Sequence, residues 1–112
     1  MKHIYIIEDD IGILEGLTFL LEKTYRVTAM CDARIALDQL TLEQPDLILL
    51  DLFMPELNGS AFLEALLERS LKIPVLVMSA AQNEQLNYPM VAGFIRKPFQ
   101  IEDVMKMIEQ VI

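Results

Sequence analysis

Basic residues are scarce in this sequence, and their scarcity excludes one class of function. Nine Lys and Arg stand against 17 Asp and Glu, which gives a net charge of -8, and no run of basic residues occurs. A protein that binds nucleic acid directly needs basic side chains against the phosphates. We therefore expect this chain not to bind nucleic acid.

Cysteine and long hydrophobic runs are also scarce. Cys31 has no second cysteine for a disulfide and no spaced His or Cys for zinc, so we expect it to be a small buried side chain in a reducing cytosol. No apolar stretch approaches the ~20 residues of a membrane span, and the first ten residues become charged after a few apolar ones. These features predict a cytoplasmic protein that is neither exported nor inserted in a membrane.

The residues that are present suffice for one domain with a substantial core, because 54% of the 112 are hydrophobic. Short apolar runs alternate with apolar residues at helical spacing. The runs predict five strands, at residues 4–7, 25–30, 47–50, 75–78 and 93–96. Helices are expected after the first three strands, the second of them with Asp32 as its N-cap, and a last helix is expected over residues 101–112.

Strands that are apolar at successive positions and alternate with helices predict a parallel sheet with helices on both faces. We expect an α/β domain over residues 1–112 with the doubly wound, flavodoxin-like fold, in which five parallel strands lie in the order 2-1-3-4-5. In that order the topology reverses between the first and third strands. Ligands bind there, beyond the carboxyl ends of the strands.

Carboxylates end the two strands at this switch point. Glu8 and Asp9 follow the first strand, and Asp51 follows the third. Like charges this close repel one another unless a proton or a cation lies between them, so the sequence predicts a metal site. Oxygen ligands favour Mg²⁺, or alternatively Mn²⁺, over zinc. The acidic residues 8–10 could instead simply favour the start of the first helix, but this leaves Asp51 unexplained.

Two further polar residues end the fourth and fifth strands. Ser79 offers a hydroxyl and Lys97 an ammonium. Acidic residues, a hydroxyl and a lysine around one pocket suit phosphoryl chemistry. A metal and Lys97 would neutralise charge on a phosphoryl group, Ser79 would donate a hydrogen bond to it, and Asp51 could be its covalent acceptor.

Four short motifs contain these residues: Glu8-Asp9, the segment DLFMPELNG from Asp51 to Gly59, Ser79-Ala80, and Lys97-Pro98. As a set with this spacing, they resemble the receiver domain of two-component response regulators, and the resemblance covers essentially the whole chain. It implies that Asp51 is the phosphorylation site. The phosphoryl group would come from a phosphohistidine on a sensor histidine kinase or phosphotransfer protein, and would switch the interaction with a downstream effector.

The resemblance also implies a ligand set for Mg²⁺. Asp9, Asp51 and the backbone carbonyl of Phe53 would hold the ion, with Glu8 acting through water. Asp10 matches no metal-binding position and is expected to enter the first helix. Because the Phe53 side chain cannot position water against an acyl phosphate, the phosphorylated form is predicted to dephosphorylate slowly.

A conformational switch and a cis peptide between Lys97 and Pro98 are implied as well. In the switch, Ser79 moves to the phosphoryl oxygen and Phe94 repacks inward. Phe94 lacks the hydroxyl of a tyrosine, so its two positions would differ in packing and not in a hydrogen bond. The alternative is a Phe94 that stays in the core throughout.

The clearest departure from the family lies between Ser79 and Phe94. This segment is shorter than usual by roughly one helical turn, and Pro89 with several turn residues disfavours a helix. We expect the fourth helix to be short, distorted or missing. In the family, the face of the fourth helix, fifth strand and fifth helix carries partner binding and dimerisation. The output partner and a homodimer therefore stay open, and the first and last helices are an alternative partner surface.

Three other classes of function are weaker. A module of this fold could signal without phosphorylation, although the set of site residues is complete. An aspartyl phosphatase would carry a second Asp where Phe53 stands, and a flavin-binding protein would need a Ser, Thr or Gly-rich turn after the first strand. The sequence therefore favours a signalling domain that promotes only its own phosphorylation and dephosphorylation over an enzyme.

Overall fold

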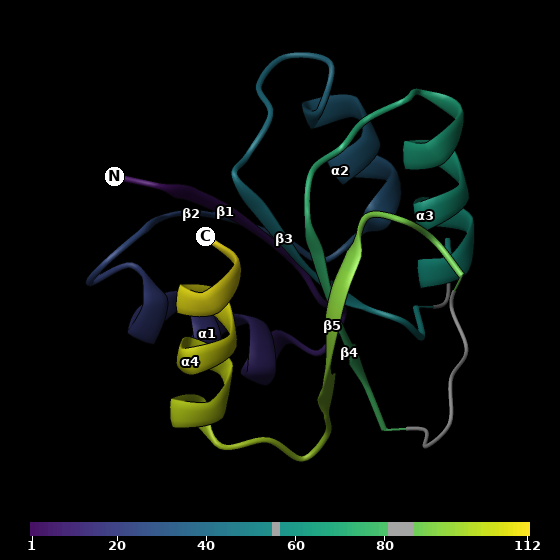
Figure 1. The fold of residues 1–112 in the computed structure, drawn as a ribbon. Helices are drawn as coiled ribbons and strands as arrows, with labels where there is room; N and C mark the ends of the chain where they lie inside the picture. Colours follow the sequence, from purple (N-terminus) through teal and green to yellow (C-terminus); the bar gives the residue numbers. More distant parts are fainter. Residues whose placement is uncertain (55–56, 81–86) are drawn as a thin grey trace.

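The computed structural model describes residues 1–54, 57–80 and 87–112, which form a five-stranded sheet between two layers of helices (Figure 1). All strand pairs are parallel and the order is β2-β1-β3-β4-β5. The predicted flavodoxin-like topology is confirmed. Along the chain the elements are β1 (His3–Ile7), α1 (Ile11–Leu21), β2 (Arg26–Met30), α2 (Ala33–Gln39), β3 (Leu47–Asp51), α3 (Gly59–Glu68), β4 (Val75–Ser79), β5 (Val91–Arg96) and α4 (Ile101–Val111).

Two hydrophobic cores lie on opposite faces of the sheet, because successive strand residues point to opposite sides. α2 and α3 cover one face, where the core includes Tyr5, Ile48, Val77, Ala36 and Phe62. α1 and α4 cover the other, where the core includes Ile6, Leu49, Met78, Leu17 and Ile108. Figure 1 shows the two helix pairs on either side of the strands. None of the described helices is long and apolar enough to cross a membrane.

Polar side chains begin the first two helices where the sequence predicted. Asp10 is the N-cap of α1, and its Oδ1 accepts a hydrogen bond from the Ile13 amide at 3.1 Å. Asp32 caps α2 by accepting from the Arg34 amide at 2.8 Å. A capping carboxylate satisfies an amide that would otherwise lack an intrahelical partner. The helix that follows β1 therefore starts directly beside the predicted site.

Gly59 fixes the loop that carries the site after β3. Its amide donates to the carbonyl oxygen of Leu52 at 2.7 Å. A Cβ at Gly59 would lie 2.7 Å from Leu52 Cα and 2.9 Å from that oxygen, which is closer than atoms can pack. Only glycine allows this approach of α3 to the loop. Pro55, which belongs to the same motif, lies outside the described residues.

Of two further predictions about the fold, one falls mainly on residues that the structure does not describe, and the other is wrong. The prediction of a short or missing fourth helix falls mainly on residues 81–86, which lie outside the described residues; the flanking residues 80 and 87–90 contain only bend, turn and irregular backbone. The prediction that Cys31 is buried is wrong, because its side chain is exposed. Cys31 follows β2, which is an edge strand, and it lies beyond the end of the core.

Candidate functional site

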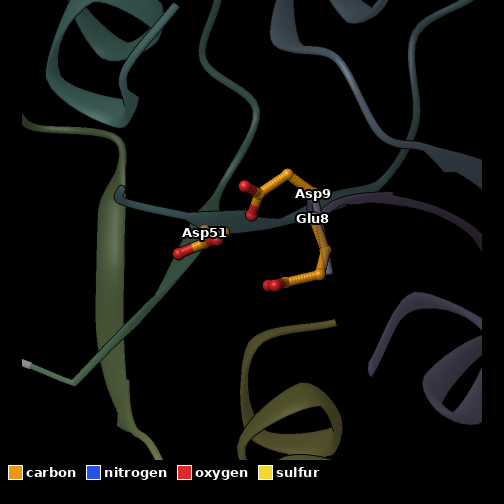
Figure 2. Close-up of side chains that lie close together, drawn as sticks. All are labelled: Glu8, Asp9 and Asp51. Carbon is orange, nitrogen blue, oxygen red and sulfur yellow. The ribbon is translucent and has the colours of Figure 1, made fainter. Parts of the chain in front are cut away.

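The carboxyl ends of β1 and β3 bring three carboxylates together. Glu8 and Asp9 follow β1, and Asp51 is the last residue of β3. One carboxylate oxygen from each residue lies within 4.8 Å of the other two, and this is the one such acidic group found among the described residues. Figure 2 shows the three side chains gathered at this edge of the sheet. The predicted convergence at the topological switch point is therefore present.

The three carboxylates differ in their exposure to water. Glu8 is fully buried, Asp51 is 4% exposed, and Asp9 is exposed. Backbone amides support the two buried groups: the Asp10 amide donates to Glu8 Oε1 at 3.3 Å, and the Phe53 amide donates to Asp51 Oδ1 at 3.2 Å. Asp51 thus sits at the inner wall of a site that opens to solvent at Asp9.

Lys97 supplies the positive charge of the site. Its Nζ donates to the two carboxylate oxygens of Glu8 at 3.1 and 3.0 Å and lies 3.4 Å from Asp51 Oδ1. Burial lowers the pKa of Lys97, but the hydrogen bond to Glu8 and the nearby carboxylate of Asp51 together raise that pKa above its ordinary value. Lys97 is therefore an ammonium that bridges two of the three carboxylates.

The surroundings of Asp51 favour its protonated form. Burial, the charge of Glu8 and a side-chain hydrogen bond with Asp9 raise the pKa of Asp51 from 3.8 to about 7. Lys97 and the Phe53 amide act in the opposite direction but do not cancel the rise. The pKa of Asp51 is raised this far because the carboxyl group is buried and lies beside other acids whose charge Lys97 does not fully compensate.

The remaining predicted site residues lie around this cluster. Ser79 ends β4 and is buried, and its carbonyl oxygen accepts from the Lys97 amide at 2.9 Å, so β4 and β5 end side by side. The Phe53 side chain points into solvent and is 56% exposed. Phe94 is 45% exposed, so its side chain does not lie in the core of this structure, while its movement in a switch stays a prediction. The cis peptide between Lys97 and Pro98 is present.

One feature of the site escaped the sequence analysis. The sequence placed Lys97 against a phosphoryl group and Glu8 against a metal, whereas the structure pairs the two side chains with each other. The signal that could have found this pair is the burial expected of a carboxylate that directly follows four apolar strand residues, because such a charge requires a cation.

A hollow of about 360 Å³ also opens beside Lys97, lined by Ile13, Ala80, Lys97, Pro98 and Phe99.

Comparison with known proteins places this geometry in a family. The family model described as the response regulator receiver domain matches residues 4–109. The chain belongs to the response regulator receiver domain family. Receiver domains of this family are signalling domains of two-component systems, which interact with histidine kinases and effector domains. Signalling that is independent of phosphorylation is thereby not favoured.

Three similar proteins illustrate the match. The transcriptional regulatory protein CiaR of Streptococcus pneumoniae is 30% identical over 116 residues, which cover 100% of this chain and 52% of that protein. The N-terminal domain of the nisin resistance regulator NsrR is 29% identical with a TM-score of 0.83, covering 99% of this chain and 97% of that chain. The chain spans about half the length of the curated relatives that it matches first.

A third structure shares the fold at lower identity. The response regulator TrrA of Thermotoga maritima, solved in complex with Mg²⁺-BeF, is 19% identical with a TM-score of 0.87 and covers 100% of both chains. This likeness shows that the receiver domain keeps its fold over the whole length of the present chain.

Proposed function

We propose that this chain, over residues 1–112, is a phosphoacceptor switch whose phosphorylation site is Asp51. The phosphoryl group would come from a phosphohistidine on a sensor histidine kinase or phosphotransfer protein. The observation that carries the proposal is the meeting of Asp51 with Glu8, Asp9 and Lys97 at the end of β3. A nearly buried carboxylate on a rigid strand end, beside a lysine and two further acids, is suited to covalent phosphoryl transfer.

The donor set of the site fits Mg²⁺, with Mn²⁺ as an alternative. It consists of oxygen atoms, which both ions prefer. Among the described residues, three carboxylates face one ammonium, and a divalent cation would balance this excess of negative charge. Asp9, Asp51 and the backbone carbonyl of Phe53 would hold the ion, with Glu8 acting through water. When bound, it supplies positive charge for the phosphoryl oxygens. TrrA, which shares the fold, was solved with Mg²⁺-BeF.

The side chains of the site have separate tasks in the transfer. An oxygen of Asp51 forms the new O–P bond while the N–P bond of the donor histidine breaks, and the departing imidazole keeps the electron pair and takes up a proton. Lys97, 3.4 Å from Asp51 Oδ1, can turn from Glu8 to a phosphoryl oxygen. Ser79, at the end of the adjacent strand, donates a hydrogen bond to another phosphoryl oxygen.

The remaining parts of the proposal concern partners and place. A downstream effector domain or protein would respond to the change in Ser79 and Phe94. We expect the chain to act in the cytoplasm, to bind neither membrane nor nucleic acid, and to promote only its own phosphorylation and dephosphorylation. The net charge of -8 supports the absence of nucleic-acid binding.

Intact mass after incubation with Mg²⁺ and acetyl phosphate or phosphoramidate tests the proposal. The wild type should gain one phosphate and Asp51→Asn should gain none. The matched control is Asp10→Asn, which removes a carboxylate just outside the cluster and keeps a good helix cap. It should be phosphorylated like the wild type. If the wild type binds Mg²⁺ but gains no mass from either donor, the proposal is wrong.

A further inference from the structure

A second hollow, of about 340 Å³, opens at the amino ends of β4 and β5, far from the acidic cluster. The end of α3 forms one wall, and the residues just before β5 form the other. Ser79 and Lys97 lie at the carboxyl ends of the same two strands, so this hollow is separate from the phosphorylation site. We call it the amino-end hollow and define it by its lining, all of it described: Leu67, Ser70, Leu71, Lys72, Pro89 and Met90.

Hydrogen bonds fix the walls of the amino-end hollow. The Tyr88 hydroxyl donates to Glu64 Oε2 on α3 at 2.9 Å, which ties the residues before β5 to that helix. The Val75 amide donates to the Met90 carbonyl at 2.8 Å, and the Val91 amide donates to the Tyr88 carbonyl at 3.1 Å. Sites for small molecules are largely pre-formed and measure about 300 to 1,000 Å³. The hollow therefore has the size and the fixed frame of such a site.

Most of the lining is hydrocarbon. Leu67 is 43% exposed on the α3 side, Leu71 is half-buried, and Met90 is buried. A ligand with an apolar body would take these side chains out of water, which is favourable in proportion to the apolar area covered. A concave apolar surface with a few polar groups is typical of a site for a small molecule.

Positive charge exceeds negative charge at this end of α3. Residues 68–72 contain Arg69 and Lys72 against Glu68, although the whole chain carries a net charge of -8. The Arg69 guanidinium donates to the Leu37 carbonyl at 2.9 Å, beside α2. Lys72 is thus the basic residue of the lining, and its ammonium only donates hydrogen bonds. One such cation is complementary to a ligand with a single negative charge.

Ser70 closes α3 in a backbone conformation that normally calls for glycine. Its φ is 56°, and its amide and the amide of Leu71 donate to the carbonyls of Leu67 and Leu66, each at 3.0 Å. Carbonyls at a helix end repel anions when they are free, but these two are satisfied. A serine here accepts backbone strain that glycine avoids and adds a hydroxyl to the lining. That hydroxyl is a second hydrogen-bond donor beside Lys72.

We propose that the amino-end hollow binds a small apolar carboxylate. The hydrocarbon part lies against Leu67, Leu71 and Met90, and the two carboxylate oxygens accept hydrogen bonds from Lys72 and Ser70. A cationic ligand is repelled by Lys72, and a neutral one leaves the ammonium without a partner. The inference is independent of the proposed function, because it uses none of the residues at the carboxyl ends of the strands.

Amide NMR shifts of the unphosphorylated chain, measured without any phosphodonor, test the site. The probes are octanoate, which carries a flexible chain, and naphthoate, which carries a ring. The amides of Leu71, Lys72 and Met90 should shift along one saturation curve with a Kd below about 1 mM for at least one probe. The tighter probe shows whether the hollow prefers a chain or a ring. Octanamide, the neutral counterpart of octanoate, should bind about five-fold more weakly.

Two variants separate the charge of the site from its apolar surface. Lys72→Met should lower the affinity for octanoate to that for octanamide and leave the affinity for octanamide unchanged. Leu67→Ser should weaken both ligands. Lys106→Met is the matched control, because Lys106 is also an exposed lysine but lies on α4. This variant should bind octanoate like the wild type.

Ser70→Gly separates binding from folding. It should raise the midpoint of urea denaturation, because glycine adopts a positive φ without strain. It should also weaken octanoate about three-fold, because one hydrogen bond is lost. A residue that served only the fold would not give these opposite signs.

Three results would overturn the inference. One is the absence of shifts at Leu71, Lys72 and Met90 with both carboxylates at about 10 mM, where a site with a Kd of about 1 mM is nearly filled. Another is a Lys72→Met variant that binds octanoate as tightly as the wild type, which excludes recognition of the anion. The third is a Ser70→Gly variant with unchanged affinity, which removes the hydroxyl from the site. Each of them leaves the phosphorylation of Asp51 untested and unchanged.

Discussion

The two ends of the sheet hold polar clusters that are built in opposite ways. At the carboxyl ends, Glu8, Asp9 and Asp51 meet Lys97, so acids outnumber bases. At the amino ends, an acid is paired directly with a base, because Arg26 donates to both carboxylate oxygens of Glu43. Around that pair, the His3 amide donates to Asp46 Oδ2 at 2.8 Å, the Asp46 amide donates to the His3 carbonyl at 2.7 Å, and the Tyr5 hydroxyl donates to the Glu43 carbonyl.

The pKa shifts of the two clusters run in opposite directions as a result. The hydrogen bond from Arg26 lowers the pKa of Glu43, whereas burial and the neighbouring acids raise the pKa of Asp51 to about 7. An acid whose pKa is lowered contributes to stability at neutral pH, and one whose pKa is raised subtracts from it. The amino-end cluster therefore holds strands together, while the carboxyl-end cluster is arranged for a ligand that supplies positive charge.

Removing the basic side chain from each cluster should produce the largest difference in stability between the two clusters. Lys97→Met leaves the fully buried Glu8 without its partner, and we expect the metal-free chain to lose about 3 kcal/mol of unfolding free energy. Arg26→Met should cost much less, because the Arg26–Glu43 pair is exposed. Urea denaturation in the presence of a chelator measures both. Relative to the wild type at the same Mg²⁺ concentration, added Mg²⁺ should recover part of the stability lost in Lys97→Met and none of that lost in Arg26→Met. Equal losses in the two variants would remove the distinction between the clusters.

The pH dependence of stability should separate the clusters next. The pKa of Asp51 is about 7 in the folded chain and near 3.8 when unfolded, so between these values the folded state binds the extra proton. The stability that this proton contributes is complete below pH 3.8 and is lost as the pH rises through 7. The free energy of unfolding then changes by at most about 1.4 kcal/mol per pH unit. Asp51→Asn does not titrate and therefore lacks this pH dependence. The metal-free wild type should therefore lose stability relative to Asp51→Asn between pH 5 and pH 8; parallel profiles would contradict the raised pKa.

The sequence predicted one end of the sheet far better than the other. The strand order and the meeting of Glu8, Asp9 and Asp51 follow from periodicity, because parallel strands bring their carboxyl ends to one edge. The amino-end cluster was not predicted, since Glu43 reaches Arg26 and His3 from a loop whose path no periodic pattern describes. An outward Phe94 before the switch was expected, because the resemblance implies that this side chain repacks inward, and the side chain is 45% exposed.

Phe53 offers a test of how the carboxyl-end site handles water. Its side chain is 56% exposed and apolar, so it cannot hold a water molecule against the acyl phosphate. Phe53→Asn should speed dephosphorylation on the order of ten-fold, equivalent to about 1.4 kcal/mol of activation free energy. The decay of the phosphorylated mass in a chelator-quenched time course measures it. Phe19→Asn, on α1, is the control and should decay like the wild type. A wild-type half-life of seconds would contradict the role given to Phe53.

His3 should have the smallest effect on stability, and its pH dependence should be opposite in sign to that of Asp51. Burial and the charge of Arg26 lower the pKa of His3 below its ordinary 6.5, and its Nδ1 is buried without a hydrogen-bond partner. The unfolded chain therefore binds the proton first on acidification. The stability that His3 contributes is complete above pH 6.5 and is lost as the pH falls through its folded pKa. Asp51 gains stability over the same pH range, so the two clusters oppose each other.

A variant that removes only the imidazole isolates this effect. His3→Gln can still hydrogen-bond to Thr28, which lies 2.7 Å from His3 Nε2, but it does not titrate. In an Asp51→Asn background, which silences the other cluster, the chain with His3 should lose stability relative to His3→Gln as the pH falls below 6.5. Urea titrations at several pH values measure the difference. A difference that grows instead as the pH rises would mean that His3 gains its proton on folding, and the amino-end cluster would then be short of positive charge as well.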